Sequence, residues 1–277
     1  MKVGSKANYP RSGGGVAQQS PIKVAPLRSP GQSLREEIED LFREEFLCWL
    51  TLTIMAWWLT GFEWMQWVLR LPGLTVCLLV SMAALGTTAF AIVRLLKLRP
   101  RIRNLHQGML GELSVGQFLE EHCREQGYKV LHDLPCDGFN IDHLLMGKGG
   151  VFCIESKTIS KPFPKASVLF DGESVRVAGQ TPDRDPVGQV QASARYINDL
   201  LARLTNRPGR TIPVRPVVLY PGWYTEGSSG KSVWVLNPKM FCAYLEHEDD
   251  CLSDAEVGLF YTHLTSFLRA KTTVTAL

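Results

Sequence analysis

Two long apolar runs interrupt an otherwise mixed pattern of polar and apolar residues. Residues 46–62 carry no charge, and a second uncharged run covers residues 71–93. Each run is long enough to cross a bilayer as a helix, which takes about 17 to 25 residues. Four tryptophans lie at or near the break between the runs, as at a lipid-water boundary: Trp57, Trp58, Trp64 and Trp67. We therefore expect a transmembrane helical hairpin over residues 46–97; the alternative is a buried hairpin of a soluble fold.

Basic residues cluster where the second apolar run ends. They are Arg94, Lys97, Arg99, Arg101 and Arg103. The turn between the runs holds a single basic residue, Arg70, whereas Arg28, Arg35 and Arg43 precede the first run. The positive-inside rule then places both termini in the cytoplasm. We expect a protein of the inner (cytoplasmic) membrane with two spans, for which the lipid bilayer is one partner.

The segments around the hairpin differ in composition. Residues 1–33 are rich in Gly, Ser, Pro and Gln and poor in large apolar residues, which predicts a disordered tail. Residues 34–45 place apolar residues at helical spacing beneath a mostly acidic face, which predicts an amphipathic lead-in helix. After the hairpin we expect a basic linker over residues 98–107 and a folded domain over residues 108–277.

The domain alternates helical and strand-like periodicity. A first helix is expected from about Leu105 to Gly127, a second over 185–204, and a third from Ser253, where Glu256 completes a capping box. Period-two runs predict strands at 128–134, 140–146, 151–157, 213–220 and 232–236. This order indicates an α/β fold with a mixed central sheet flanked by helices.

The distribution of charge removes one argument for a nucleic-acid partner. The chain has a formal charge of +3, but from Asn104 onward it has 17 Lys and Arg against 20 Asp and Glu. The positive excess therefore belongs to the tail and the membrane exit, and overall basicity is no evidence for nucleic-acid binding.

The cysteines do not point to disulfides or a zinc site. Seven are present, with no CxxC pair, and the chain has no HExxH motif. An odd number without paired spacing indicates reduced thiols in a cytosolic domain.

The strongest chemical signal is the stretch IDHLLMGKGGVFCIESK, residues 141–157. If GKGG is a hairpin turn, Asp142 lies opposite Glu155, and alternation puts Lys157 on the same face. Two facing carboxylates repel unless a cation neutralises them. A three-residue loop would shift the register and turn Asp142 away, and a structural ion pair on a solvated strand face is the plain alternative.

Such a patch suits phosphodiester hydrolysis. Two carboxylates and a nearby backbone carbonyl favour Mg²⁺ or Mn²⁺, which engages phosphate and lowers the pKa of a bound water. A lysine beside the ion can position or deprotonate the attacking water. Asp142 and Glu155 are therefore candidate metal ligands, with Lys157 as the candidate catalytic group.

Several spaced elements resemble the nuclease-related domain (NERD) of the PD-(D/E)xK restriction-endonuclease-like superfamily. They are the Gly-Glu pair at 111 and 112, Ile-Asp-His at 141–143, Glu-x-Lys at 155–157, and Gln189 in the next helix. The resemblance covers residues 108–204 clearly. It implies that Asp142 and Glu155 bind metal, that Lys157 assists the nucleophile, that Glu112 supports the metal, and that Gln189 lines the site. Core-edge hydrogen bonding is the alternative role for Gln189.

Three further residues have competing interpretations. His143 alternates away from Asp142 and is expected to pack or to form hydrogen bonds. Trp223 and Tyr224 could stack on an unpaired base, but hydrophobic packing is the favoured reading.

Together these features predict a membrane-anchored, Mg²⁺- or Mn²⁺-dependent nuclease with DNA as substrate. A second hypothesis is a catalytically silent, membrane-tethered module that binds nucleic acid or an unknown protein partner. Small residues around Gly86 would also let the apolar helices form a homo-oligomer.

Overall fold

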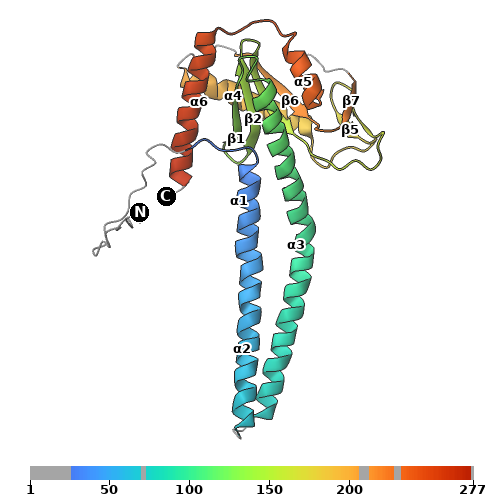
Figure 1. The fold of residues 1–277 in the computed structure, drawn as a ribbon, viewed down its shortest axis with the longest axis vertical. Helices are drawn as coiled ribbons and strands as arrows, with labels where there is room; N and C mark the ends of the chain where they lie inside the picture. The colour runs from blue at the N-terminus through green and yellow to red at the C-terminus, as the bar shows by residue number, and fades with distance from the viewer. Residues whose placement is uncertain (1–25, 70–72, 206–211, 228–231, 276–277) are drawn as a thin grey trace, which may run out of the picture.

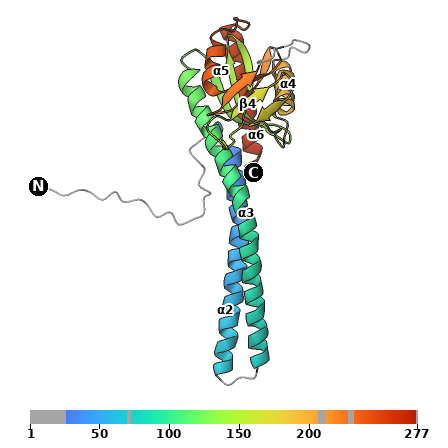
Figure 2. The same ribbon diagram turned by 90° about the vertical axis from the view of Figure 1, so that its right-hand side faces the viewer.

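The structure consists of a long helical hairpin and an α/β domain at its open end (Figure 1). It is a computed structural model that describes residues 26–69, 73–205, 212–227 and 232–275. The two arms of the hairpin lie side by side, as Figure 2 shows from a second direction, and α3 continues past the first arm into the domain.

Both arms of the hairpin are longer than the apolar runs. The first arm joins α1 (Gln32–Leu41), a π-helical turn η1 (Phe42–Leu47) and α2 (Cys48–Val68). The second arm is the single helix α3 (Leu74–His122), which enters the domain without a break. The second apolar run and the first helix of the domain are therefore one element.

The structure corrects two expectations about the segments next to the hairpin. Residues 98–107, expected as a linker, are helical throughout, and Pro100 lies inside α3. Most of the expected disordered tail lies outside the described residues, but residues 26–33 are described and contact the domain. Gln32 and Ser33 already belong to α1. The first helix of the domain also ends at His122 rather than Gly127.

The domain is built on the expected mixed sheet. Its strands are β1 (Lys129–Pro135), β2 (Asn140–Gly147), β3 (Gly150–Ser156), β6 (Val214–Leu219) and β8 (Trp234–Leu236). Their order is β1-β2-β3-β6-β8. The first three are antiparallel, and β3, β6 and β8 are parallel, so the sheet is mixed.

Helices cover both faces of this sheet. Side chains of α3 and α5 (Pro238–Leu245) share one apolar core with Phe152 and Ile154 of β3. Side chains of α4 (Pro186–Leu204) and α6 (Asp254–Thr275) share the other core with Val151 and Cys153. The alternation of the β3 side chains thus divides them between the two cores.

A second, three-stranded sheet was not expected from the sequence. Its order is β5 (Val175–Val177), β4 (Ser167–Phe170) and β7 (Tyr224–Gly227). Trp223 directly precedes β7 and is buried in an apolar cluster, with its ring N–H bonded to the Ile159 carbonyl at 3.0 Å. Trp223 therefore packs, as favoured above, whereas Tyr224 is exposed.

Local signals read from the sequence have their expected form. The Ser253 hydroxyl accepts the Glu256 N–H at 3.3 Å, and the Glu256 carboxylate accepts the Ser253 N–H at 3.0 Å. This is the predicted capping box at the start of α6. All seven cysteines are free thiols.

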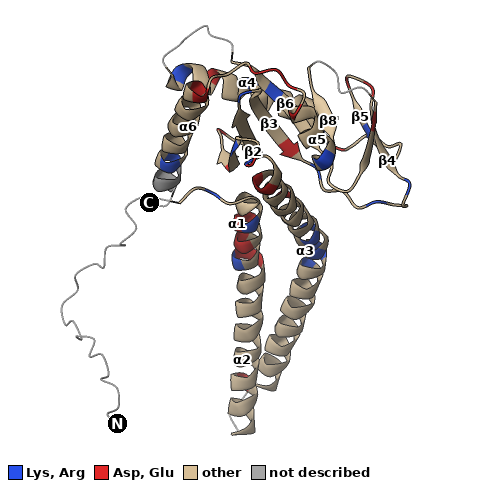
Figure 3. Cartoon of the chain, turned by 45° about the horizontal axis from the view of Figure 1, so that its top comes forward, with Lys and Arg blue, Asp and Glu red and all other residues tan. Residues whose placement is uncertain are grey.

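The apolar parts of α2 and α3 leave most of their large side chains exposed. The two helical arms are long and apolar enough to cross a membrane. Their contact includes hydrogen bonds from Trp57 Nε1 to Thr88 Oγ1 and from Trp64 Nε1 to Ser81 Oγ, each 3.0 Å long. Charged residues gather instead on α1 and on α3 near the domain (Figure 3).

Candidate functional site

The β2–β3 hairpin has the register that the sequence predicts. Gly147 pairs with Gly150 around the two-residue turn Lys148-Gly149, and the ladder continues to His143 and Ile154. Asp142 and Glu155 lie one step beyond this last pair. The expected facing pair therefore lies where the two strands stop bonding to each other.

The side chain of Asp142 forms the hydrogen bond that follows the last backbone pair between β2 and β3. Its Oδ2 accepts the backbone N–H of Ser156 at 2.7 Å. This bond takes the place of a ladder bond to the β2 backbone and holds the carboxylate against β3. Its other oxygen, Oδ1, is left for a further ligand.

Glu155, Lys157 and Gln189 form one hydrogen-bonded group. Lys157 Nζ lies 2.6 Å from Glu155 Oε1 and 3.1 Å from Gln189 Oε1. The Gln189 amide also donates to Glu155 Oε1, at 2.8 Å. Gln189 is in the first turns of α4, so the start of this helix is fixed to the end of β3.

The plain alternative, an ion pair on a solvated strand face, does not describe this group. The side chains of Glu155 and Lys157 are only 7% and 24% exposed. A carboxylate and an ammonium are costly to bury without satisfied partners, and here Gln189 bonds to both. The pair is therefore part of an enclosed polar group.

Glu112 approaches from α3. Burial, followed by the charges of Asp133 and Glu155, raises the pKa of Glu112 to about 8. The backbone N–H of Gly31 and the charge of Lys157 oppose this rise. Glu112 is thus electrostatically part of the site, although no hydrogen bond joins it to Asp142 or Glu155 among the described residues.

Crowding of carboxylates also perturbs Asp142. Burial, then the charges of Glu155 and Glu112, raise its pKa well above the ordinary value. The Ser156 N–H and Lys157 lower it, but by less. Three acidic groups whose charges oppose one another make a place where a cation would be stabilised.

Asp142 and Glu155 are the two residues of this group that could hold a divalent ion. Asp142 and Glu155 each have one carboxylate oxygen that is not used in the bonds above. Mg²⁺ commonly binds through one or two carboxylates and keeps several waters. No group of three or more His, Cys, Asp or Glu side chains in the described part of the chain is arranged to hold a metal. Glu112 therefore does not complete a three-residue ligand set.

Asp133 is a member of this region that the sequence did not single out. It lies on β1 between the pairs His132–His143 and Leu134–Ile141, level with Asp142, and is 2% exposed. Its carboxylate is bonded by Arg28 and Ser33. Its position as an acidic residue on an otherwise apolar strand could have singled it out in the sequence. Its bonding partners could not be identified in that way, because they lie about a hundred positions away in the chain.

A buried histidine pair lies on the α3 side of the sheet. Nδ1 of His132 and Nδ1 of His143 are 2.9 Å apart, and His132 Nε2 lies 3.3 Å from Glu120. Burial and the neighbouring His132 lower the pKa of His143 well below its usual value. The prediction that His143 packs and forms hydrogen bonds is therefore confirmed.

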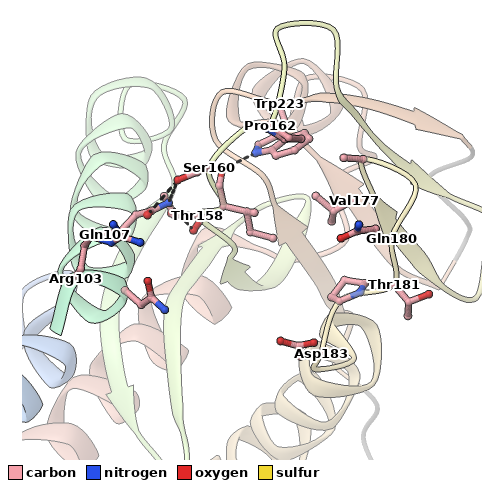
Figure 4. A pocket seen from close by; sticks show the side chains of 14 residues that line it. Arg103, Gln107, Thr158, Ser160, Pro162, Val177, Gln180, Thr181, Asp183 and Trp223 are labelled. Atoms are coloured by element: carbon pink, nitrogen blue, oxygen red, sulfur yellow. Dashed lines mark hydrogen bonds between the residues drawn. The ribbon is translucent and has the colours of Figure 1, made fainter. Parts of the chain in front are cut away.

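A cavity of about 660 Å³ adjoins the site (Figure 4). Its wall includes Thr158, which follows Lys157 directly, and Gln107 of α3, which bonds to Ser160. The five predicted site residues do not line it. Its charged lining consists of Arg103 and Asp183.

Comparison with known proteins agrees with this architecture. Residues 107–221 match the family model of the nuclease-related domain, NERD. No curated protein and no solved structure matches the chain. The matched region includes the domain half of α3, strands β1 to β6 and helix α4, and so contains all five predicted site residues. Residues 107–221 are therefore similar to the NERD family, and this region begins within α3, the second of the two long apolar helices.

Proposed function

We propose that the protein is a membrane-anchored, divalent-metal-dependent nuclease that hydrolyses phosphodiester bonds, with DNA as its substrate. The observation that carries the proposal is the enclosed group of Glu155, Lys157 and Gln189 beside the buried carboxylate of Asp142. The NERD match supports the same reaction class.

The side chains have distinct roles in this proposal. Asp142 and Glu155 would hold the metal through their remaining carboxylate oxygens. Glu112, whose pKa is raised to about 8, would ionise beside the bound cation. A bound Mg²⁺ supplies positive charge for the scissile phosphate and makes an adjacent water more acidic. The Lys157 ammonium, held by Glu155 and Gln189, orients the attacking water by donating a hydrogen bond to it.

The exposed apolar surface of the hairpin supports the proposed membrane anchoring. Leu79 and Met82 are 67% and 70% exposed, and large apolar side chains at such density are stable in lipid rather than in water. The basic cluster after the second run orients the domain toward the cytoplasm. The charged band of Figure 3 would then lie at the head groups.

The test uses the full chain in detergent micelles with Mg²⁺ or Mn²⁺ and single- and double-stranded DNA and RNA. We expect Glu155→Gln and Lys157→Ala each to lower the cleavage rate by about 10²- to 10⁴-fold. Glu226→Gln and Lys165→Ala change exposed residues of the same types and should leave the rate unchanged.

Cleavage that persists at the wild-type rate in both site variants would exclude this site. Preferential cleavage of RNA would retain the reaction class and replace the substrate. Loss of activity in the control variants as well would point to unfolding, which circular dichroism would detect.

One observation favours a second candidate, a silent binding module. The wall of the cavity carries one basic and one acidic residue, Arg103 and Asp183, and therefore offers no net positive charge to a polyanion. Calorimetric titration separates the two candidates. The nuclease should take up Mn²⁺ at millimolar concentration and lose this uptake in Glu155→Gln, whereas the silent module should show none.

A further inference from the structure

The segment that precedes the first apolar helix is docked on the NERD domain. Residues 28–33, here called the docked segment, lie outside the matched region 107–221. Arg28 Nε lies 2.6 Å from Asp133 Oδ2, and the Ser33 N–H donates to the same oxygen at 2.9 Å. The Ser33 hydroxyl lies 2.5 Å from Asp133 Oδ1. Both carboxylate oxygens of Asp133 are therefore bonded by this segment.

Asp133 is well suited to receive such a segment. Its side chain is 2% exposed, and a buried carboxylate is costly unless it is paired and hydrogen-bonded. Arg28 supplies the opposite charge and is itself only 14% exposed. The guanidinium also donates to Ser33 and Glu36, so its planar set of N–H donors is held in one orientation.

The middle of the docked segment packs on α3. Pro30 lies against Gly116, where any Cβ would come within 2.5 Å of the proline ring. Gly31 lies against Met109 at φ 69°, a conformation that favours glycine. Positions 109, 112 and 116 form one stripe on α3, so the segment follows a single face of the helix.

We infer that the docked segment is a positioning element of the candidate site. Arg28 and Ser33 act through Asp133, while Pro30 and Gly31 pack on the face of α3 that carries Glu112. This role rests on the proposed nuclease function. It also means that residues 107–221 alone lack the segment that bonds Asp133 and packs on the Glu112 face of α3.

The first measurement is hydrogen exchange of the Ser33 amide in the full chain in micelles. Arg28→Ala and Asp133→Asn should each speed this exchange at least tenfold. The double variant should be no faster than the more affected single variant, because the two residues act as one pair. Arg35→Ala is the matched control. Within the described ranges Arg35 pairs only with Glu39, on an exposed face of α1, so the Ser33 amide of this variant should exchange at the wild-type rate.

The second measurement is the Mn²⁺ dependence of DNA cleavage. In Arg28→Ala the Mn²⁺ concentration for half-maximal rate should rise several-fold, a shift that a smaller folded fraction cannot produce. Arg28→Lys keeps the positive charge but lacks the planar set of guanidinium N–H donors. It should therefore raise the Mn²⁺ concentration for half-maximal rate less than Arg28→Ala does. Arg35→Ala should again match wild type.

The two hypotheses can fail separately. Rapid exchange of the Ser33 amide in wild type, or equal behaviour of Arg28→Ala and Arg35→Ala, overturns the inference whatever the cleavage assay shows. Arg28-dependent protection with an unchanged Mn²⁺ dependence shows docking without positioning and overturns the positioning role. A wild-type chain that cuts no nucleic acid overturns the proposed function, and the positioning role with it, while the exchange data still decide the docking.

Discussion

The two halves of helix α3 follow opposite packing rules. In the hairpin half, the buried residues are small: Cys77, Ala84 and Ala91, spaced by seven. In the domain half, Val115 and Leu119 are buried together with glycines. The helix is continuous, so the difference lies in what surrounds it. A seam of small residues with large apolar residues outside is typical of helices packed in lipid, whereas the domain half buries its large residues as a soluble protein does.

The largest expected contrast concerns phenylalanine. Phe152 of β3 is 1% exposed and contacts the rings of Trp234 and Phe241, so Phe152→Ala should cost the domain about 3 to 5 kcal/mol. Phe90, in the hairpin half of α3, is exposed and lies outside the domain, so Phe90→Ala should leave the domain transition unchanged. Guanidinium unfolding followed by circular dichroism in micelles measures both. Equal destabilisation by Phe152→Ala and Phe90→Ala would show that the hairpin half of α3 buries its large apolar side chains as the domain does.

Two exposed leucines sharpen the comparison next. Leu79→Arg should reduce stable membrane insertion, because arginine at the centre of a spanning helix costs about 2.5 to 3.5 kcal/mol. Leu169→Arg, on the exposed face of β4, should change stability by at most about 0.5 kcal/mol and leave insertion intact. The measurement is the fraction of full chain that stays in membranes after alkaline extraction. Full retention of Leu79→Arg would argue against a bilayer around this half of α3.

The smallest contrast is between two glycines of α3. A Cβ at Gly111 would overlap the side chain of Thr158, so Gly111→Ala should cost about 1 to 3 kcal/mol. Beyond the backbone of its own helix turn, an added Cβ at Gly86 meets no described atom within 4 Å. Gly86→Ala should therefore stabilise the helix by up to about 1 kcal/mol. Thermal unfolding in micelles gives the sign of each change. A stabilising Gly111→Ala would show that α3 does not approach Thr158 so closely.

Sequence patterning predicted the elements whose packing is local. The strands of the main sheet, helix α4 and the capping box of α6 each have a periodicity or a spacing that one physical rule explains. The small second sheet was missed because its strands have only three or four residues, too few to establish alternation. The continuity of α3 was missed because a basic stretch with a proline resembles a linker.

The parts of the candidate site that depend on local strand geometry were also predictable from the sequence. Hairpin register alone placed Asp142 and Glu155 at neighbouring positions, and alternation placed Lys157 beside Glu155. The bond from Ser156 to Asp142 depends on where the ladder ends, which the pattern does not specify. The pairing of Arg28 with Asp133 is a tertiary contact between segments 105 positions apart, and no local rule links them.

The unbroken α3 has a consequence for how a polyanion would meet this protein. From Arg94 to Glu112 the helix rises about 27 Å, at roughly 1.5 Å per residue. The negative potential of a bilayer surface decays over a screening length of about 8 Å at physiological salt. With the hairpin in the membrane, the rigid helix therefore acts as a spacer that keeps the carboxylates and any bound phosphate chain beyond the repulsion of the head groups.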